Sequence, residues 1–572
     1  MQQYILLFGR SGGALVKIQQ FIRHLYGKRV SINTAGLFAL AVILAITQFL
    51  SAWYLGQIID SISLGLSSVI SNTIIIAVAV LVNFIADFLL FALMQNMSIK
   101  LTNLLQKKLS EKLCKTEYKA LSDISDGELM TTVTDNAEGI TQWFSVIVAL
   151  GQIPIKIVIV FIAIIQIHWV LFLICLVLFP LTLLPSLFLS KKMYDFNIEE
   201  QKAVGNNINF IKETLGFLIV LKSYCLEKIF IRKNRAHLDE LESARLKKAK
   251  RDRLIQSFGR CIGYIANPVL FTVAGYLILQ GNMTVGQIIS VMFFIDIAGE
   301  GINLVTGIGN QYQAVKSCIS RIKTLLDLPD ERTTGEALAP VEEQPVFDIQ
   351  EVSFSYQESK ILQGISLPIM KGDKVAILGK SGSGKTTLFK LLNGLYTPDE
   401  GRILFKGQDI AQLSIDDLRK NLSVVPQESF VFSDTIYHNI AIAKPGASKE
   451  EVIRACRLAR IHEFIETLDD GYDTVLNNVI VSLSNGQMQR INLARAFLRD
   501  GDVWLFDEPT SALDVKSRDA IIDYMVNQTG NKTVICIIHE PELISRFTLQ
   551  AVVCDGKIAS VKRRCDGGEN DD

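Results

Sequence analysis

Several features are scarce or absent in this sequence, and each absence narrows the class of protein. Neither sign of charge is in excess, since 58 basic residues stand against 58 acidic ones, so the composition does not indicate binding to nucleic acid or another polyanion. The nine cysteines are an odd number without a Cys-x-x-Cys pair, which is typical of reduced, structural cysteine rather than of a disulfide framework or metal site. No cleavable signal peptide is evident, and we interpret residues 1–30 as an amphipathic segment on the inner membrane face.

Long stretches of the first 325 residues carry little or no charge, in a chain that is 49% hydrophobic. About 20 apolar residues in a helix cross the hydrocarbon layer of a bilayer, and a turn at His168 and Trp169 would divide an apolar run that is too long for one helix. The sequence therefore predicts an α-helical polytopic membrane domain over residues 31–325. Its six transmembrane helices are predicted at 33–59, 69–97, 144–167, 170–189, 261–280 and 285–308.

Positive charge is distributed unevenly between the loops that join these predicted helices. The long loops after the second and fourth helices carry most of the lysine and arginine, whereas the short turns after the others carry almost none. Because positive charge marks the cytosolic side, we expect both long loops and both termini in the cytoplasm. Buried core helices of a soluble protein would not show this alternation.

The composition changes near residue 325. Residues 326–345 are rich in Pro, Glu and Thr and are interpreted as a linker, and residues 563–572 as an acidic tail. Between them, short β-branched runs alternate with helical stretches, which predicts an α/β domain with a mainly parallel sheet over residues 346–562. The predicted strands are 346–354, 374–378, 422–425, 503–506 and 533–538.

One segment of this domain matches the glycine-rich phosphate loop of an ATPase. It follows a predicted strand and opens a helix, the context in which backbone N–H groups wrap phosphates. Lys385 would reach the β- and γ-phosphates, and Thr386 would offer its hydroxyl to Mg²⁺. The candidate ATP-binding residues of this segment are Gly379, Lys380, Ser381, Gly382, Ser383, Gly384, Lys385, Thr386 and Thr387.

Two carboxylates follow the apolar strand at 503–506. Asp507 is suited to coordinating Mg²⁺, and Glu508 is suited to accepting a proton from a water molecule that attacks the γ-phosphate. Acidic residues at strand ends are common, but a phosphate loop in the same domain favours a hydrolytic site.

The sequence resembles the ATP-binding-cassette (ABC) transporters. Residues 483–487, Leu-Ser-Asn-Gly-Gln, stand before a helix with Arg490 and Arg495 and are similar to the signature motif of that family. The resemblance implies that Tyr356 stacks on adenine and that Gln427 links the nucleotide and its Mg²⁺ to the membrane domain.

The resemblance also covers the last part of the chain and extends over nearly its whole length. His539 matches the switch histidine, and residues 511–514, Ser-Ala-Leu-Asp, match the loop that crosses the dimer interface, which makes Asp514 a nucleotide-site candidate. Six spans followed by this ATPase resemble an exporter-type half-transporter with the type IV fold, embedded in the inner membrane of a bacterium.

The family resemblance further implies a dimer with two ATP molecules, each with Mg²⁺, between its ATPase domains. Each nucleotide would contact the phosphate loop of one subunit and Ser484 and Gly486 of the other. Residues 124–136 and 214–220 would form coupling helices that rest on the ATPase domains, the second on that of the opposite subunit. The implied catalytic residues are Glu508, His539, Lys385 and Gln427, and the implied metal-site residues are Thr386, Gln427 and Asp507.

Three positions depart from the family pattern. Asn485 replaces the first of two signature glycines, so we expect a reduced or altered ATPase rate rather than its loss. Asn477-Asn478 stands where relatives carry Gly-Glu, and Glu540 stands where a basic residue is usual.

Four ionisable residues lie inside the predicted spans, namely Asp87, Lys156, Asp296 and Glu300. An intramembrane charge is costly, so each should face a partner or water. Two interpretations stay open: Lys156 pairs internally, for instance with Asp87 or Asp296, or the group lines a polar substrate path. Asp296 and Glu300 are four residues apart, so they share one helical face, and we select them as candidates for that path.

The function predicted from the sequence is ATP-driven export of an amphipathic or hydrophobic molecule, with a peptide-like product favoured and a lipid or drug as other candidates. An importer of a metal chelate with the same fold is the alternative. A non-transporting regulator is a third class, against which the hydrolytic residue Glu508 argues. A homodimer is favoured over a heterodimer because the hydrolytic set is complete.

Overall fold

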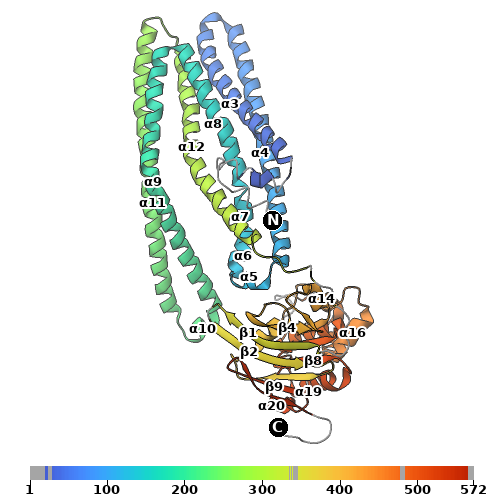
Figure 1. The fold of residues 1–572 in the computed structure, drawn as a ribbon. Helices are drawn as coiled ribbons and strands as arrows, with labels where there is room; N and C mark the ends of the chain where they lie inside the picture. Colours follow the sequence, from blue (N-terminus) through green and yellow to red (C-terminus); the bar gives the residue numbers. More distant parts are fainter. Residues whose placement is uncertain are drawn as a thin grey trace. The chain divides into compact units, whose positions relative to one another are not determined.

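The computed structural model describes residues 29–333, 345–357, 359–476 and 483–564, together with residues 18, 20–23, 27, 335 and 338. The chain forms two compact units (Figure 1). The helical unit comprises Met1–Lys112 and Asp126–Asp327, and the α/β unit comprises Leu113–Ser125 and Leu328–Asp572. Most of the predicted N-terminal segment, much of the linker, the pair at 477–478 and nearly all of the acidic tail lie outside the described residues.

Six long helices make up most of the described part of the helical unit, and each contains one of the predicted spans. They are α3 (Arg29–Ser61), α4 (Leu66–Lys115), α8 (Gln142–Ile167), α9 (Trp169–Gly216), α11 (Glu227–Leu279) and α12 (Val285–Leu326). The shorter α6 (Asp126–Val133), α7 (Asp135–Gly139) and α10 (Leu218–Ser223), with a 3-10 turn at Ile62–Leu64, join them. At 1.5 Å per residue the 53-residue α11 is about 80 Å long, so it extends well beyond a hydrocarbon layer of about 30 Å.

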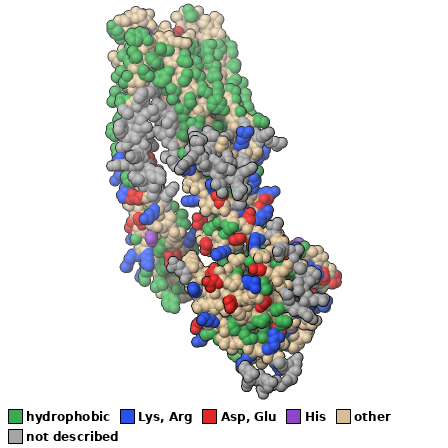
Figure 2. Space-filling view, in the orientation of Figure 1, with side chains coloured by type: hydrophobic (Ala, Val, Ile, Leu, Met, Phe, Trp, Pro, Cys, Tyr) green, Lys and Arg blue, Asp and Glu red, His purple; other side chains and the backbone are tan. Residues whose placement is uncertain are grey.

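The surface of the helical unit is apolar over a broad band. Phe84, Phe88 and Phe91 on α4 expose 69%, 64% and 57% of their surface, which water would not favour. Figure 2 shows hydrophobic side chains over the half of the unit near the α8–α9 turn and charged side chains along the other half. Within the described residues, three helical stretches are long and apolar enough to cross a membrane: Ile32–Leu64, Leu66–Lys115 and Asp126–Ile167. Shorter apolar stretches at Trp169–Leu178 and Asn267–Leu279 lie in the predicted fourth and fifth spans.

The predicted turn between the third and fourth spans is confirmed, and a single residue makes it. His168 leaves the helical conformation, with φ −163° and ψ 127°, and its Nδ1 accepts a hydrogen bond from the Val170 N–H at 3.2 Å. This bond caps α9, so α8 and α9 form a tight helical hairpin.

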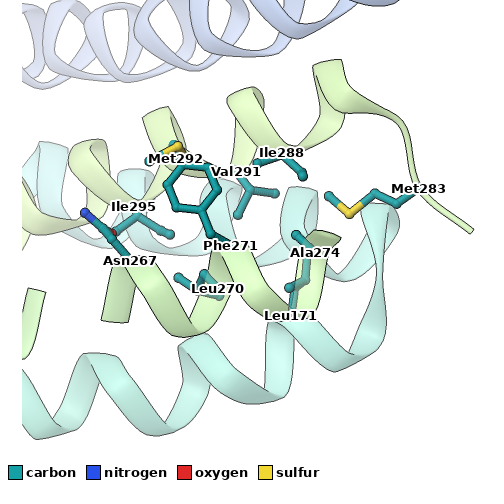
Figure 3. A pocket seen from close by; sticks show the side chains of 10 residues that line it. All are labelled: Leu171, Asn267, Leu270, Phe271, Ala274, Met283, Ile288, Val291, Met292 and Ile295. Carbon is teal, nitrogen blue, oxygen red and sulfur yellow. The ribbon is translucent and has the colours of Figure 1, made fainter. Parts of the chain in front are cut away.

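The packing between α9, α11 and α12 leaves one small cavity among the described side chains (Figure 3). It is apolar apart from Asn267 and is lined by Leu171 of α9, Phe271 of α11 and Ile288 and Ile295 of α12, among others. Its volume of about 10 Å³ is close to that of one water molecule, so it cannot hold an amphipathic substrate in this conformation.

The end of α3 and the start of α12 approach each other closely. A Cβ atom at Gly56 would collide with the Gly286 carbonyl and the Ser290 hydroxyl. Beside it, the Asp60 carboxylate accepts hydrogen bonds from the Thr284 hydroxyl at 2.6 Å and the Gly286 N–H at 2.9 Å. Asp60 thus places negative charge at the positive N-terminal end of α12.

The α/β unit contains two sheets. The larger has the strand order β10-β9-β3-β8-β7-β6, and β6, β7, β8, β3 and β9 run parallel, as predicted for the domain. The smaller, antiparallel sheet has the order β2-β1-β4-β5 and was not predicted. The strands are β1 (Phe347–Tyr356), β2 (Ser359–Ile369), β3 (Lys374–Leu378), β4 (Glu400–Phe405), β5 (Gln408–Asp409), β6 (Leu422–Val425), β7 (Val503–Asp507), β8 (Thr533–Ile537), β9 (Leu549–Cys554) and β10 (Lys557–Arg563).

Helices cover the larger sheet and connect its strands. They are α13 (Lys385–Leu392), α14 (Ile415–Lys420), α15 (Ile436–Ala441), α16 (Lys449–Leu458), α17 (His462–Glu466), α18 (Asn485–Arg499), α19 (Val515–Asp523) and α20 (Pro541–Ile544), with a 3-10 turn at Gly471–Asp473 and a π-helical turn at Tyr524–Gln528.

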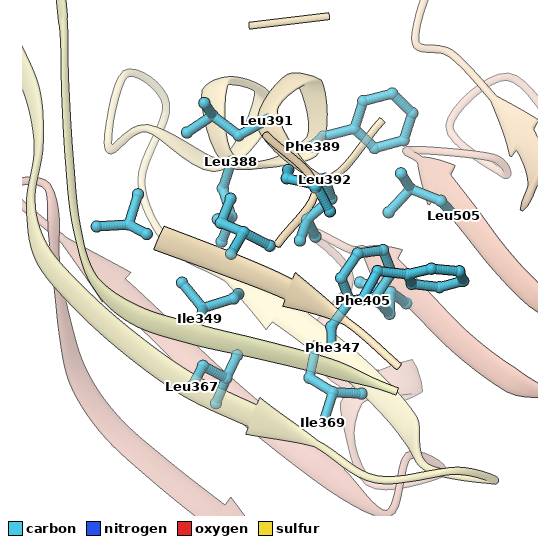
Figure 4. Packing of buried hydrophobic residues seen from close by; sticks show 14 of the residues in the cluster. Phe347, Ile349, Leu367, Ile369, Leu388, Phe389, Leu391, Leu392, Phe405 and Leu505 are labelled. Atoms are coloured by element: carbon cyan, nitrogen blue, oxygen red, sulfur yellow. The ribbon is translucent and has the colours of Figure 1, made fainter. Parts of the chain in front are cut away.

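Strand β7 is buried on both faces, which explains why its sequence is a continuous apolar run. Successive side chains of a strand point to opposite faces. Val503 and Leu505 therefore pack in the core that α13 shares with the antiparallel sheet (Figure 4), whereas Trp504 and Phe506 pack in a second core on the other face. Such burial is expected for a central parallel strand.

A short segment between α4 and α6 belongs to the α/β unit, which corrects the predicted boundaries. Residues 113–125 lie inside the predicted membrane domain, yet α5 (Tyr118–Ser122) packs in the α/β unit: the Tyr118 and Tyr396 rings meet edge to face at 5.7 Å, and the Tyr396 hydroxyl donates to Ser122 Oγ at 3.2 Å. Most of the predicted first coupling segment, 124–136, lies in the helical unit, where Asp126–Val133 form α6 and Asp135–Gly139 form α7.

We predict that Gly56→Ala forces α3 and α12 apart and destabilises the helical unit, because overpacking a close contact costs about 1–3 kcal/mol. Thermal unfolding of the purified protein in detergent measures the effect. Gly275→Ala on α11 is the matched control, since a Cβ there meets nothing within 4 Å. A melting temperature for Gly56→Ala equal to that of the control would contradict the prediction.

Candidate nucleotide site

The predicted phosphate loop joins the end of β3 to the start of α13, as the sequence indicated. Gly379, Gly382 and Gly384 have φ values of 149°, 80° and 103°, which side chains other than glycine rarely adopt. A Cβ at Gly379 would also collide with the Val553 carbonyl. The local fold therefore requires glycine, and the chain is free to turn closely around an anion at the N-terminus of α13.

Lys385 begins α13 and is buried with its ammonium group inside the loop. Its Nζ donates hydrogen bonds to the carbonyls of Gly379 at 2.9 Å and Lys380 at 2.8 Å. Burial lowers the pKa of Lys385, and the nearby Asp507 and Glu508 carboxylates oppose that shift. The loop, the lysine and the two acidic residues thus form one electrostatic group.

Asp507 ends β7 and is only 1% exposed. Burial raises the pKa of its carboxyl group, whereas a hydrogen bond from Thr386 lowers it. Its Oδ1 atom, like the Oγ atom of Ser383, is buried without a hydrogen-bond partner among the described residues. Since buried polar atoms are nearly always paired, an unpaired carboxylate oxygen beside a threonine hydroxyl is a donor set that fits Mg²⁺.

Glu508 follows in a left-handed conformation, with φ 51°. Its side chain is 22% exposed, and its Oε1 atom lies 2.8 Å from Nε2 of His539, which follows β8. The backbone N–H of Glu508 donates to the Ile537 carbonyl at 3.2 Å. The structure thus brings two of the implied catalytic residues, Glu508 and His539, into direct contact, a pairing that the sequence did not predict.

The carboxyl ends of four neighbouring parallel strands bring these residues to one edge of the larger sheet. Lys385 follows β3, Asp507 and Glu508 follow β7, His539 follows β8, and Gln427 stands in an exposed position after β6. Ligands of open α/β sheets bind at such an edge.

Tyr356 lies at the end of β1 and is half-buried rather than free. Its ring meets the rings of Phe354 at 5.0 Å and Tyr396 at 5.4 Å, both nearly edge to face. Two neighbouring aromatic rings therefore fix the position of the Tyr356 ring at the end of β1.

The signature residues form the start of α18. Ser484 caps this helix and accepts a hydrogen bond from the Gln487 N–H at 3.3 Å, while Asp514 caps α19 and accepts from the Ser517 N–H at 2.9 Å. That backbone hydrogen bond lowers the pKa of Asp514. In the described part of the chain, Ser484, Gly486 and Asp514 make no hydrogen bond to the phosphate loop of their own chain.

Two side chains on α18 connect it to the loops around the site; Gln489 was not identified from the sequence, whereas Arg495 was noted only as part of the helix after the signature motif. Gln489 is 5% exposed and bonds the residues after β7, and Arg495 donates to the carbonyls of Asn439 and Phe430, on the segment that follows Gln427. Burial lowers the pKa of Arg495 to about 10. For Gln489, its place directly after the signature motif is the signal in the sequence that could have identified it.

The charged residues of the spans pair differently from the examples that the sequence suggested. Lys156 on α8 is 4% exposed and forms an ion pair at 3.2 Å with Glu300 on α12, rather than with Asp87 or Asp296. Asp296 and Asp87 are exposed in the single chain, and no ion pair to either occurs among the described residues. The reason is position along α12, since Glu300 and not Asp296 lies level with Lys156.

A membrane-spanning helical unit fused to a P-loop ATPase unit defines an ATP-hydrolysing membrane transporter. Residues 35–298 match the ABC transporter transmembrane region and residues 362–511 match the ABC transporter ATPase domain. The chain belongs to the ABC transporter family, as a half-transporter with the exporter-type fold.

Three relatives and one solved structure illustrate the similarity. ATP-dependent lipid A-core flippases are 29% identical over 460 residues in Syntrophus aciditrophicus (79% of this chain, 76% of that protein) and 32% over 395 residues in Desulfotalea psychrophila (68% of each). The alpha-hemolysin translocation ATP-binding protein of Escherichia coli O157:H7 is 37% identical over 289 residues, 50% of this chain and 40% of that protein. A bacterial Atm1-family ABC exporter with ATP bound has the same fold, with a TM-score of 0.79 and 23% identity over 93% of this chain and 95% of the other.

We predict that Asp507→Asn removes the extra thermal stabilisation that Mg²⁺ gives in the presence of ATP, because a ligand stabilises the state that binds it. Melting temperatures with ATP plus Mg²⁺ and with ATP plus EDTA are compared. Asp502→Asn is the control, since Asp502 is exposed and paired with Lys406 at 2.8 Å. An undiminished Mg²⁺ increment in Asp507→Asn would show that this carboxylate does not hold the metal.

Proposed function

We propose that this protein is an ATP-driven exporter of a lipid-like amphiphile, working as a homodimer in a bacterial inner membrane with its termini and ATPase units in the cytoplasm. The observation that carries the proposal is the grouping of Lys385, Asp507, Glu508 and His539 at one sheet edge, in a chain whose other unit is a membrane-spanning helical bundle. Glycines 379, 382 and 384 give the loop a conformation that can wrap phosphates, and the exposed phenylalanines of α4 favour an apolar surrounding.

In the proposed reaction Glu508 is the general base. As the water oxygen bonds to the γ-phosphorus, Glu508 accepts the water proton, and the bond to the bridging oxygen breaks to leave ADP and phosphate. His539, at 2.8 Å, holds the Glu508 side chain in place, and Lys385 stabilises the phosphate charge. Thr386, Asp507 and Gln427 would hold Mg²⁺, which when bound neutralises the phosphate oxygens.

Further residues would complete the nucleotide site. Tyr356 would stack on the adenine, and Ser484, Gly486 and Asp514 of the partner would meet the nucleotide across the dimer interface. The absence of bonds between these signature residues and their own phosphate loop, within the described residues, supports a site that only a dimer completes.

The relatives shift the favoured substrate from a peptide to a lipid-like amphiphile. The flippase relatives match this chain over 79% and 68% of its length, which requires similarity in the membrane domain, whereas the alpha-hemolysin translocation protein matches half of it. The pairing of Glu300 with Lys156 also removes one of the two carboxylates that favoured a cationic substrate. Asp296 then remains the candidate contact for an amine or other cationic group on the amphiphile.

The second predicted coupling segment, residues 214–220, has an exposed apolar surface suited to binding another protein surface. Phe217 and Ile219 expose 56% and 82% of their surface around α10, and an apolar pocket of about 300 Å³ lies beside them, between α9 and α11. Apolar side chains exposed on a cytosolic tip favour contact with another protein surface, which we propose is the ATPase unit of the second subunit.

We predict that Glu508→Gln abolishes both ATP hydrolysis and translocation, since removing a general base typically costs on the order of 10²–10⁴-fold in rate. Steady-state ATPase is measured in nanodiscs, and ATP-dependent movement of a fluorescent lipid analogue is measured in proteoliposomes with ATP on one known side. Glu542→Gln, an exposed glutamate on α20, is the control. Near-normal hydrolysis in Glu508→Gln would refute the base, and movement toward the ATP side would indicate an importer.

We predict that Asp296→Asn loses substrate-stimulated ATPase while basal ATPase and folded yield stay normal. Glu300→Gln, by contrast, should lower the folded yield, because it leaves the buried Lys156 charge unpaired, and Lys156→Met in the same chain should restore it. If Asp296→Asn transports normally, the residue does not contact the substrate. If Glu300→Gln folds as well as the wild type, the ion pair is not structural.

A further inference from the structure

The buried side chain of Gln489 joins α18, the helix that begins with the signature motif, to the proposed general base Glu508. Gln489 lies on α18, five residues after Ser484, and is 5% exposed. Its Nε2 donates hydrogen bonds to the Glu508 carbonyl at 2.8 Å and to Ser511 Oγ at 3.3 Å. Its Oε1 accepts from the Ala512 N–H at 3.0 Å. Both ends of the amide are therefore used on the loop that follows β7.

Glu508 is held in a conformation that needs such support. A glutamate at φ 51° is in a sparsely populated region, which persists only where the surroundings fix it. The N–H side of Glu508 is fixed to the Ile537 carbonyl at 3.2 Å, and its own carbonyl is fixed by Gln489. This conformation aims the carboxylate at His539, 2.8 Å away.

A second contact joins the signature turn at the start of α18 to the same loop. A Cβ on Gly486 would lie 2.6 Å from the Ala512 carbonyl, so the signature turn and this loop are in close contact. A shift of Gly486 toward this loop would press on Ala512, which Gln489 in turn connects to Glu508.

We propose that Gln489 is a positioning residue that makes the general base of one ATP site respond to the nucleotide in the other. The proposal rests on the proposed function, in which Ser484 and Gly486 contact ATP held by the partner subunit. ATP at that site fixes the signature turn, and Gln489 transmits its position to the strained peptide of Glu508. Hydrolysis at each site then depends on ATP at the other, which is cooperativity in ATP.

The test is Gln489→Leu, which removes all three hydrogen bonds, and Gln489→Glu, which keeps the acceptor for Ala512 and loses both donated bonds. Asn492→Leu is the matched control, because Asn492 is also 5% exposed on α18 but bonds Arg495 instead of the loop. ATPase is measured against ATP concentration in nanodiscs, with the melting temperature of each variant.

Both Gln489 variants should lose roughly tenfold to hundredfold in kcat, the scale expected when a catalytic group is misplaced rather than removed, with KM for ATP within about threefold. Their Hill coefficient should fall to about one, and their melting temperature should match or exceed that of Asn492→Leu. A kcat within about twofold of the wild type would overturn the proposal. An unchanged Hill coefficient would also overturn it, whether or not the melting temperature falls.

A double variant separates this proposal from the function on which it rests. If Gln489 acts through Glu508, then Gln489→Leu with Glu508→Gln should be no slower in single-turnover hydrolysis than Glu508→Gln alone. If the double variant hydrolyses ATP more slowly than Glu508→Gln alone, Gln489 does not act through Glu508 and the proposal is overturned. Near-normal ATPase in Glu508→Gln alone would refute the proposed base, whereas an inactive Glu508→Gln beside a fully active Gln489→Leu would refute the positioning role only.

Discussion

The burial of β7 on both faces is the constraint on which the nucleotide site depends. Because Val503 and Leu505 fill one core and Trp504 and Phe506 the other, the strand cannot slip or rotate without exposing a large apolar side chain. The strand therefore delivers Asp507 and Glu508 to a fixed position at the sheet edge. The parallel neighbours β3 and β8 deliver Lys385 and His539 to the same edge, so four side chains from three segments far apart in sequence meet there.

The site holds charged groups in a buried environment that disfavours each of them alone. Burial disfavours both the Lys385 ammonium and the Asp507 carboxylate, and each is tolerated because the other lies close by. Glu508 adds a strained backbone at the same place. Unpaired oxygens, shifted pKa values and strain are typical of a site built to bind a charged ligand rather than to maximise stability.

The helical unit follows different rules because its surroundings are apolar. Apolar side chains gain little by leaving a lipid-like surrounding, so their burial does not by itself hold the helices together. The helices pack instead by close backbone approach, as at Gly56 and Gly286, and by polar groups that pair inside the bundle. Lys156 illustrates the second rule, since its charge is buried and neutralised by Glu300 from another helix. Asp60 illustrates it at a helix end, where two hydrogen bonds connect α3 to α12.

The sequence by itself determined the elements and motifs that depend on local pattern. The apolar runs predicted all six long helices, the β-branched runs predicted five strands of the two sheets, and His168 ended α8 where the run required a turn. The phosphate loop was predictable because glycine at positive φ and a strand before a helix are local properties.

Only the tertiary structure decided which distant residues are neighbours. Lys156 pairs with Glu300, α5 packs against Tyr396 in the α/β unit, and Gln489 holds the Glu508 carbonyl; each of these contacts depends on how helices and strands pack, not on spacing along the chain. The antiparallel β1–β2–β4 sheet was missed for the same reason, since its strands pair across turns and a helix and share an apolar core with α13. Local pattern specifies a side chain's element and face, whereas its partner is set by long-range packing.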